Sequence, residues 1–181
     1  LIVFTSDNGC AGYIGGACSN APHSGFKRYH QEGGIRVPFI VSWPKTLPAN
    51  SIYKQPVSVL DLYETFRAAS GDKTPESEDS NVRDSVNLIP YVADQKKEAP
   101  HQYLYWRSGP TKAIRDSRWK LIQYNRTDLT SKDLRADGRL QPPAQGWPLS
   151  SPHGQLTLLY DLDSDPEEKT NLAKHHEDIV I

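Results

Sequence analysis

The first nine residues, LIVFTSDNG, constrain the fold more than any other stretch of this sequence. Leu1 to Thr5 form a short apolar run that suits a strand covered on both faces, as in a parallel sheet. Asp7 and Asn8 follow where such a strand ends, and the carboxyl ends of strands are where open α/β sheets bind ligands. The run therefore predicts a buried parallel strand that leads into a site. An ordinary strand followed by an Asx turn explains the same residues.

The chemistry of the two polar residues points to a metal ion. Asp7 offers a carboxylate and Asn8 an amide carbonyl, and such hard oxygen donors suit Ca²⁺ or Mg²⁺ better than Zn²⁺. Gly9 lets the backbone turn sharply directly after them. These residues are candidate metal ligands.

Composition describes a globular chain without a strong charge. Its 181 residues, 36% hydrophobic and 24% charged, suffice for one ordinary domain or two small ones. The net charge of -1 gives no general attraction to nucleic acid, so we expect no nucleic-acid partner. No apolar run approaches the roughly 18 residues of a membrane span. The sequence contains no Met, from which we expect a piece of a longer protein.

Two cysteines lie in a loop rich in glycine and alanine. Cys10 and Cys18 can close a small disulfide loop, but their spacing does not require one. The sequence has no CxxC pair, so we expect no zinc cluster. Asn125 opens a glycosylation sequon, a pattern common by chance.

The first half of the chain predicts one more strand and one helix. Gly33 and Gly34 predict a turn that leads into a second apolar run, residues 35–43, which we interpret as another parallel strand ended by Pro44. Residues 58–70 show helical periodicity, with a capping box at Ser58 and Asp61 and a stop at Gly71. We expect the helix to pack its apolar stripe on a sheet. The stripe comprises Val59, Leu62, Tyr63, Phe66 and Ala69. Residues 71–85 read as a polar surface linker.

The second half predicts a small antiparallel sheet. Its candidate strands are the aromatic and β-branched runs 103–107, 111–124 and 156–162. The long loop 125–155 between the last two is a candidate binding edge or a disordered segment. The sequence from Asp165 predicts a final helix that runs to about Val180.

Three motifs in this order and spacing resemble the C-terminal portion of a type I, formylglycine-dependent sulfatase. They are Ser6-Asp7-Asn8-Gly9, then Lys27 five residues ahead of Glu32-Gly33-Gly34-Ile35-Arg36-Val37-Pro38, and Leu159-Tyr160-Asp161-Leu162 with Asp165-Pro166-Glu167 and Asn171-Leu172-Ala173. The resemblance implies the alkaline phosphatase-like α/β sulfatase fold. Residues 1–85 would then belong to the C-terminal part of the catalytic α/β domain. Residues 86–181 would form a small C-terminal subdomain with an antiparallel sheet and a terminal helix.

The resemblance also implies roles for individual residues. Asp7 and Asn8 resemble the family's calcium ligands, and Lys27 resembles the catalytic lysine that contacts the sulfate group. A fixed ammonium and a divalent ion stabilise the negative charge that develops as a sulfate ester breaks. His23 and His30 flank Lys27 and are candidate substrate-binding residues, although loop histidines are more often solvated or hydrogen-bonded.

One family feature is absent from this sequence. Neither Cys-x-Pro-x-Arg nor Ser-x-Pro-x-Arg occurs, so we expect the residue that becomes formylglycine to lie upstream. The remaining calcium ligands would lie there too, because Ca²⁺ prefers about six to eight oxygens. We therefore expect this chain alone to be inactive.

Three functions stay open at this stage. The first is sulfate-ester hydrolysis, with a sulfated small molecule or glycan as substrate. The second is a phosphoester or phosphonate hydrolase of the same superfamily, and the third is a non-catalytic module that binds sulfated glycans. The resemblance favours the sulfatase, in the periplasm, secreted or in a lysosome. The sequence leaves the oligomeric state open.

Overall fold

The computed structural model describes residues 1–11, 14, 18–27, 29–72, 84–108, 111–125 and 155–180. The chain forms two compact units, each assembled from two separate stretches of sequence. The first unit comprises 1–5 and 39–104, and the second comprises 6–38 and 105–181. The predicted domain boundary after residue 85 stays a prediction, since compactness within this chain and membership of a larger domain are different properties.

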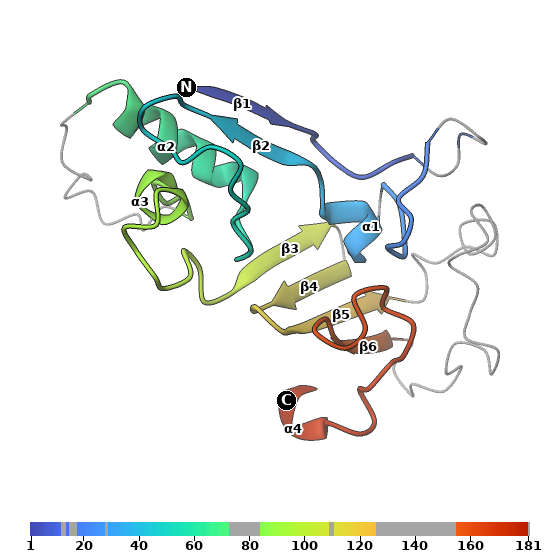
Figure 1. Ribbon diagram of the computed structural model, residues 1–181. Helices are drawn as coiled ribbons and strands as arrows, with labels where there is room; N and C mark the ends of the chain where they lie inside the picture. The colour runs from blue at the N-terminus through green and yellow to red at the C-terminus, as the bar shows by residue number, and fades with distance from the viewer. Residues whose placement is uncertain are drawn as a thin grey trace. The chain divides into compact units, whose positions relative to one another are not determined.

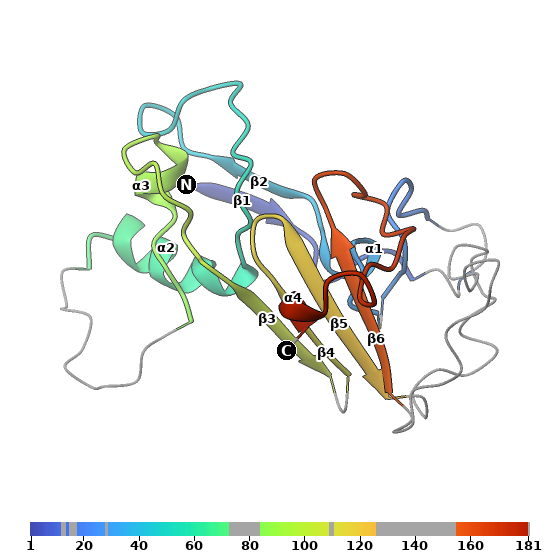
Figure 2. The ribbon, with the colours of Figure 1, turned by 90° about the horizontal axis from the view of Figure 1, so that it is seen from below.

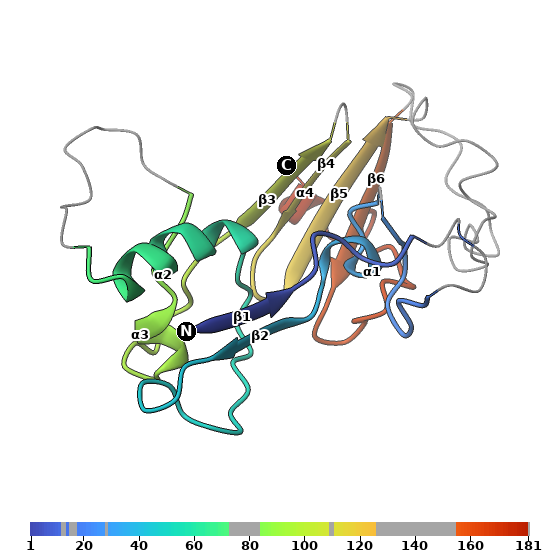
Figure 3. The same ribbon diagram turned by 90° about the horizontal axis from the view of Figure 1, so that it is seen from above.

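A two-stranded antiparallel sheet opens the first unit. Strand β1 (Ile2–Thr5) pairs with β2 (Phe39–Ser42), with Val3 opposite Val41 and Phe4 opposite Ile40, and Figure 3 shows them side by side. The interpretation of both as parallel strands was wrong for this pair. An apolar run suits either direction, and only the partner decides it. Along both strands exposed and half-buried residues alternate, so neither strand is covered on both faces in this chain.

The predicted helix over 58–70 is confirmed as a 3₁₀ turn, η1 (Val59–Asp61), that continues into α2 (Leu62–Ala69). The capping box is present: Ser58 Oγ accepts from Leu60 N at 3.2 Å, and Asp61 Oδ2 accepts from Ser58 N at 2.8 Å. Gly71 follows the helix with a φ of +79°, a left-handed conformation that favours glycine.

The expected burial of the apolar stripe was wrong. The stripe residues Val59, Tyr63 and Phe66 are exposed, whereas Asp61, Glu64 and Thr65 are buried. These polar residues bind the segment that follows residue 84: Asp61 Oδ1 accepts from Val86 N at 3.0 Å, and Thr65 Oγ1 accepts from Leu88 N at 3.0 Å. Leu88 precedes the short helix α3 (Ile89–Val92), which lies near α2 in Figure 1.

The second unit contains the predicted antiparallel sheet, with strand order β3-β4-β5-β6. Its strands are β3 (Leu104–Ser108), β4 (Thr111–Arg115), β5 (Trp119–Asn125) and β6 (Gln155–Asp161), and Figure 2 shows them side by side. The predicted run 111–124 is two strands, because residues 116–118 turn the chain and pair Arg115 with Lys120. Between β5 and β6, Ile122 lies opposite Leu158. The predicted loop 125–155 falls almost wholly outside the described residues, as does most of the linker 71–85.

The core of the second unit lies on one face of this sheet. Side chains at alternate positions of β5 and β6 meet two aromatic residues of the loop before α1 (Glu32–Ile35). The buried cluster contains Phe26, Tyr29, Ala113, Ile122, Tyr124, Leu156, Leu158 and Tyr160. Phe26 meets Tyr29 edge to face, with ring centroids 4.7 Å apart. The loop that precedes α1 is therefore anchored on the sheet.

The end of the chain departs from the predicted final helix. Only α4 (Glu177–Val180) is helical, and most of 162–176 consists of turns. Glu168 has a φ of +56°, which breaks a helix, and Asn171 Oδ1 accepts a hydrogen bond from Leu159 N at 3.0 Å. Local propensity therefore yields to bonds with the sheet. Within the described part of the chain, no helix combines the length and apolar character needed to cross a membrane.

Candidate functional site

Backbone contacts hold the candidate ligand segment against α1. Gly9 N donates to Gly34 O at 2.9 Å, and Gly33 N donates to Ser24 O at 2.7 Å. The backbones approach so closely that a Cβ on Gly9 would overlap the Gly33 carbonyl, and one on Gly34 would overlap the Tyr29 carbonyl. Only glycine fits at these positions. The turn predicted at Gly33 and Gly34 thus places Asp7 and Asn8 directly beside α1.

The loop with the two cysteines is fixed by a disulfide and one asparagine. Cys10 and Cys18 form the disulfide that the spacing left open. Asn20 Oδ1 accepts from Cys10 N at 2.7 Å, and Asn20 Nδ2 donates to Gly25 O at 3.0 Å. Lys27 N donates to Cys10 O at 2.9 Å. The backbone of Lys27 therefore lies against the segment that follows Asp7 and Asn8.

Lys27 occupies an exposed position between two buried anchors. Phe26 is 1% exposed and Tyr29 5%, and both belong to the core of the second unit. The side chain of Lys27 itself is exposed. A lysine held in this way presents its ammonium group from a rigid backbone, which suits the binding of an anion.

Asp7 is exposed and Asn8 half-buried. The Ser6 hydroxyl donates to the backbone carbonyl Asn8 O at 2.9 Å, which fixes the turn between these residues. Among the residues that the structure describes, no group of three or more His, Cys, Asp or Glu side chains could hold a metal ion. The chemistry of the two donors fits Ca²⁺, but they supply too few oxygens for a complete site. Their assignment as calcium ligands stays a prediction.

The two candidate histidines differ in their surroundings. His23 is half-buried, and its Nδ1 lies 3.1 Å from Pro166 O, so that nitrogen carries the proton because a carbonyl only accepts. His30 is buried at 6% exposure, and its backbone N donates to Tyr124 Oη at 3.3 Å. Burial and the nearby charge of Lys120 lower the pKa of His30, which keeps its ring neutral at pH 7. Their contact with substrate stays a prediction.

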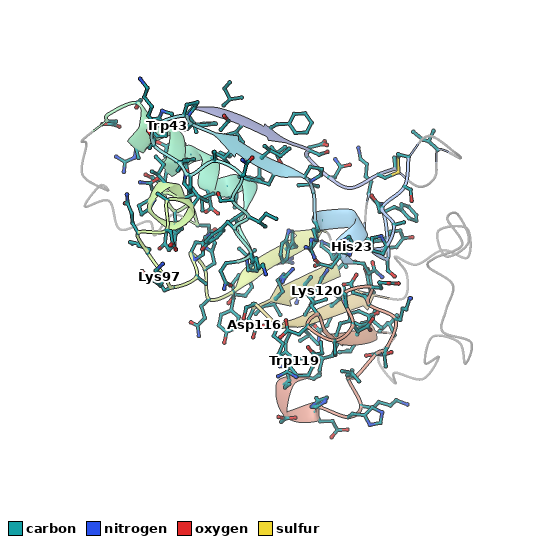
Figure 4. All side chains as sticks on the ribbon, in the orientation of Figure 1. His23, Trp43, Lys97, Asp116, Trp119 and Lys120 are labelled. Atoms are coloured by element: carbon teal, nitrogen blue, oxygen red, sulfur yellow. A yellow bond between two sulfur atoms is a disulfide. The ribbon has the colours of Figure 1, made fainter. Side chains whose placement is uncertain are left out.

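A buried cluster of charges lies between α1, the sheet and the C-terminal segment. Lys120 Nζ lies 2.9 Å from Glu32 Oε1 and 2.9 Å from Glu168 Oε1, and none of these side chains is more than 1% exposed. Arg115 adds a second cation 3.1 Å from Glu32 Oε1. Figure 4 labels Lys120 on the four-stranded sheet. Two carboxylates thus share a buried lysine, an arrangement that requires close geometry to offset desolvation.

The pKa values of the two carboxylates in this cluster shift in opposite directions. Burial works to raise the pKa of Glu32, but Lys120 and Arg115 outweigh it, so its pKa lies below the ordinary value. Burial raises the pKa of Glu168 to about 7 despite the charge of Lys120. Glu168 Oε1 accepts no aligned hydrogen bond within the described residues, although Lys120 Nζ is close. Glu32 is therefore ionised at neutral pH, whereas Glu168 exchanges its proton there.

Sequence analysis missed Lys120 and Glu168. The signal for Lys120 was the period of the strand, because Lys120, Ile122 and Tyr124 alternate onto the core face. A lysine in phase with core residues predicts a buried partner. Glu168 carried no such signal, since it fell in the first turn of the predicted C-terminal helix.

Comparison with known proteins identifies the family. Residues 1–71 match the family model described as Sulfatase. Arylsulfatase H of the dog, Canis lupus familiaris, is 32% identical over 191 residues, which cover 98% of this chain and 33% of the relative. The chain belongs to the sulfatase family. This confirms the resemblance drawn from the three motifs.

Two further matches extend over nearly all of this sulfatase chain. An N-acetylgalactosamine-6-O-sulfatase of Bacteroides thetaiotaomicron is 26% identical, over 99% of the chain and 34% of the relative. The crystal structure of a sulfatase from Pseudoalteromonas sp. superposes with a TM-score of 0.68 at 21% identity, over 97% of the chain and 33% of that structure. The α/β sulfatase fold is therefore confirmed for the part of it present here. The chain spans about a third of the length of these relatives.

Proposed function

We propose that this chain is part of a sulfatase that hydrolyses a sulfate ester, in which Lys27 contacts the sulfate group. One observation carries the proposal: two backbone hydrogen bonds, Lys27 N to Cys10 O and Gly9 N to Gly34 O, hold the lysine segment and the Asp7 and Asn8 segment together. Membership of the sulfatase family supports the same reaction.

The chemistry of the residues fits this role. The ammonium group of Lys27 would bind the sulfate oxygens and stabilise the negative charge that grows on them as the ester bond breaks. The buried neighbours Phe26 and Tyr29 fix the backbone of Lys27, so little reorganisation is needed at that moment. The nucleophile, which the family resemblance implies to be formylglycine, is assigned outside this chain.

Asp7 and Asn8 would bind calcium together with oxygen ligands from outside this chain. Bound there, calcium would withdraw charge from the sulfate group as a Lewis acid. The exposed carboxylate of Asp7 and the hard oxygen donors of the pair support this assignment.

The proposed substrate is a sulfated carbohydrate. The relative from Bacteroides thetaiotaomicron is named for a 6-O-sulfated amino sugar and aligns over 99% of this chain. The disulfide between Cys10 and Cys18 supports action in an oxidising compartment, which is the periplasm, the extracellular space or the lysosome.

The test compares ester classes and metal states in the full-length protein. Turnover of an aryl sulfate and of 6-O-sulfated N-acetylgalactosamine is measured with added calcium and after chelation. We expect calcium-dependent release of sulfate, with the matching aryl phosphate hydrolysed at least about a hundredfold more slowly. A preference for the phosphate ester would favour the phosphoesterase. Binding of sulfated glycans without turnover of any ester would favour the non-catalytic module.

Two substitutions test whether Asp7 and Asn8 bind calcium. Asp7→Ala and Asn8→Ala should raise the calcium concentration that gives half-maximal activity, because each removes one oxygen donor. Asp94→Ala is a matched control, since Asp94 is exposed and pairs with Lys97 at 2.6 Å in the first unit. An unchanged calcium requirement in Asp7→Ala would rule out that residue as a ligand.

A further inference from the structure

Three hydrogen bonds join the loop that carries Lys27, residues 23–32, to the C-terminal segment 166–168. We call these three contacts, together with the ion pairs of Lys120, the clamp. Residues 166–168 touch the loop at both ends: His23 Nδ1 donates to Pro166 O at 3.1 Å, and Ser24 Oγ donates to Glu167 O at 2.6 Å. At the far end Glu32 N donates to Glu168 Oε2 at 2.6 Å. These partners are more than 130 residues apart in sequence, so the contacts are tertiary. Lys27 lies between the two points of attachment.

Lys120 secures the clamp from the sheet. Its Nζ lies 2.9 Å from Glu32 and 2.9 Å from Glu168, and therefore holds the two carboxylates together. The side chain of Lys120 is fully buried, so solvent does not screen these contacts. Without Lys120, the side chains of Glu32 and Glu168 would lose the cation that lies within 2.9 Å of both at the base of the loop.

The same turn connects the clamp to the candidate ligands. Glu32 begins α1, and Gly34 in α1 accepts the hydrogen bond from Gly9, next to Asn8. A displacement of Glu32 would therefore move both Lys27 and the Asp7 and Asn8 segment.

We infer that Lys120 and Glu168 are positioning residues of the sulfate site, which act through Glu32 and α1 to set the place of Lys27. This inference rests on the proposed function, because it assigns Lys27 to that site. It extends that function by giving residues of the four-stranded sheet and of the C-terminal turn a role in the reaction.

Kinetics of the full-length protein provide the first arm of the test. Lys120→Met keeps the length of the side chain without its charge, and Glu168→Gln keeps an acceptor for Glu32 N. Each should lower kcat/KM for an aryl sulfate at least about tenfold, mainly through kcat. The reason is that a misplaced charge-stabilising group loses more of its interaction with the transition state than with the bound substrate. Lys112→Met, an exposed lysine on the same sheet, should stay within about twofold of wild type.

Amide hydrogen exchange provides the second arm and does not depend on activity. In both variants the amides of 24–34 should exchange at least about tenfold faster, while those of α2 in the first unit keep their wild-type rate. Equal acceleration in α2 would indicate general destabilisation and overturn the inference. So would a kcat/KM within about threefold of wild type in both variants.

The two arms separate this inference from the proposed function. If the wild-type protein hydrolyses no sulfate ester, the proposed function fails and exchange alone decides on the clamp. Unchanged exchange in 24–34 would then overturn the clamp, and selective acceleration would support it. The variant that combines Lys120→Met with Glu168→Gln leaves fewer unpaired charges than Lys120→Met alone, so it keeps the test decisive if the single lysine variant does not fold.

Discussion

Glu32 illustrates how one residue connects distant parts of the chain. Its carboxylate binds Lys120 and Arg115 from two strands, and its backbone N–H binds Glu168 from the C-terminal segment. In the sequence Glu32 was visible only as the first residue of the Glu32-Gly33-Gly34 motif. What the motif could not reveal were the partners, because they lie more than 80 residues away in sequence.

At Gly34, the addition of a single methyl group should strongly lower the free energy of unfolding. A Cβ on Gly34 would overlap the Tyr29 carbonyl, and that backbone cannot move without displacing the core. We expect Gly34→Ala to lower the free energy of unfolding by about 3 kcal/mol, as overpacking does. Gly71→Ala is the matched control, because it meets no atom within 4 Å and should cost about 1 kcal/mol for its positive φ. Chemical denaturation of the full-length protein measures both, and equal losses would contradict the account.

Glu168 should make stability depend on pH near neutrality. Its pKa is raised from 4.5 to about 7 in the folded state, so the folded protein binds more protons than the unfolded chain between these values. Proton binding by Glu168 therefore stabilises the folded state by on the order of 3 kcal/mol below about pH 4.5. This stabilisation is lost as the pH rises through about 7. Glu168→Gln should abolish this component. A variant that keeps the wild-type slope of unfolding free energy between about pH 5 and 7 would refute the assignment.

At the scale of elements, the sequence predicted where α2 lies better than which face it buries. The capping box and Gly71 define the ends through local hydrogen bonds, which need no distant partner. Periodicity located the apolar stripe correctly, but the covered face depends on which segments pack there. In this chain the segment 84–101 binds the polar face, where His101 Nε2 lies 2.9 Å from Asp61 Oδ1.

The two capping residues of this helix, Ser58 and Asp61, should contribute differently to the stability of the fold. Ser58→Ala removes the acceptor for one backbone N–H and should cost about 1 kcal/mol. Asp61→Ala should cost at least about twice as much, because it leaves the N–H groups of Ser58 and Val86 and the His101 ring without their acceptor. Thermal unfolding of the full-length protein measures both. Equal costs for the two variants would show that the buried contacts of Asp61 contribute little.

Strand direction and the C-terminal helix also could not be predicted from local sequence patterns alone. An apolar run predicted strands at both 1–5 and 35–43, but pairing alone decides that β1 and β2 are antiparallel. The helix expected from Asp165 onward is interrupted because Glu168 and Asn171 bind α1 and the sheet. Propensity is local, and both outcomes depend on tertiary partners.

For the whole molecule, the candidate site residues fall in one unit, and most of the exposed large apolar residues fall in the other. Asp7, Asn8, Lys27, His23 and His30 all belong to the second unit, which joins 6–38 to 105–181. The first unit carries exposed apolar residues on β1, β2 and α2. The family motifs point to these candidate residues from sequence alone, because each motif is local, and the roles of the residues stay predictions. The clamp could not be foreseen, because its two halves are far apart in the chain.

The most direct test of the central claim is the activity of Lys27→Ala in the full-length protein. With an aryl sulfate as substrate, we expect kcat/KM to fall at least about a hundredfold, as when a charge-stabilising donor is removed from an active site. Lys54→Ala, which removes an exposed lysine of the first unit, should retain wild-type activity. A kcat/KM for Lys27→Ala within about threefold of the control would contradict the assignment of this lysine to the sulfate site.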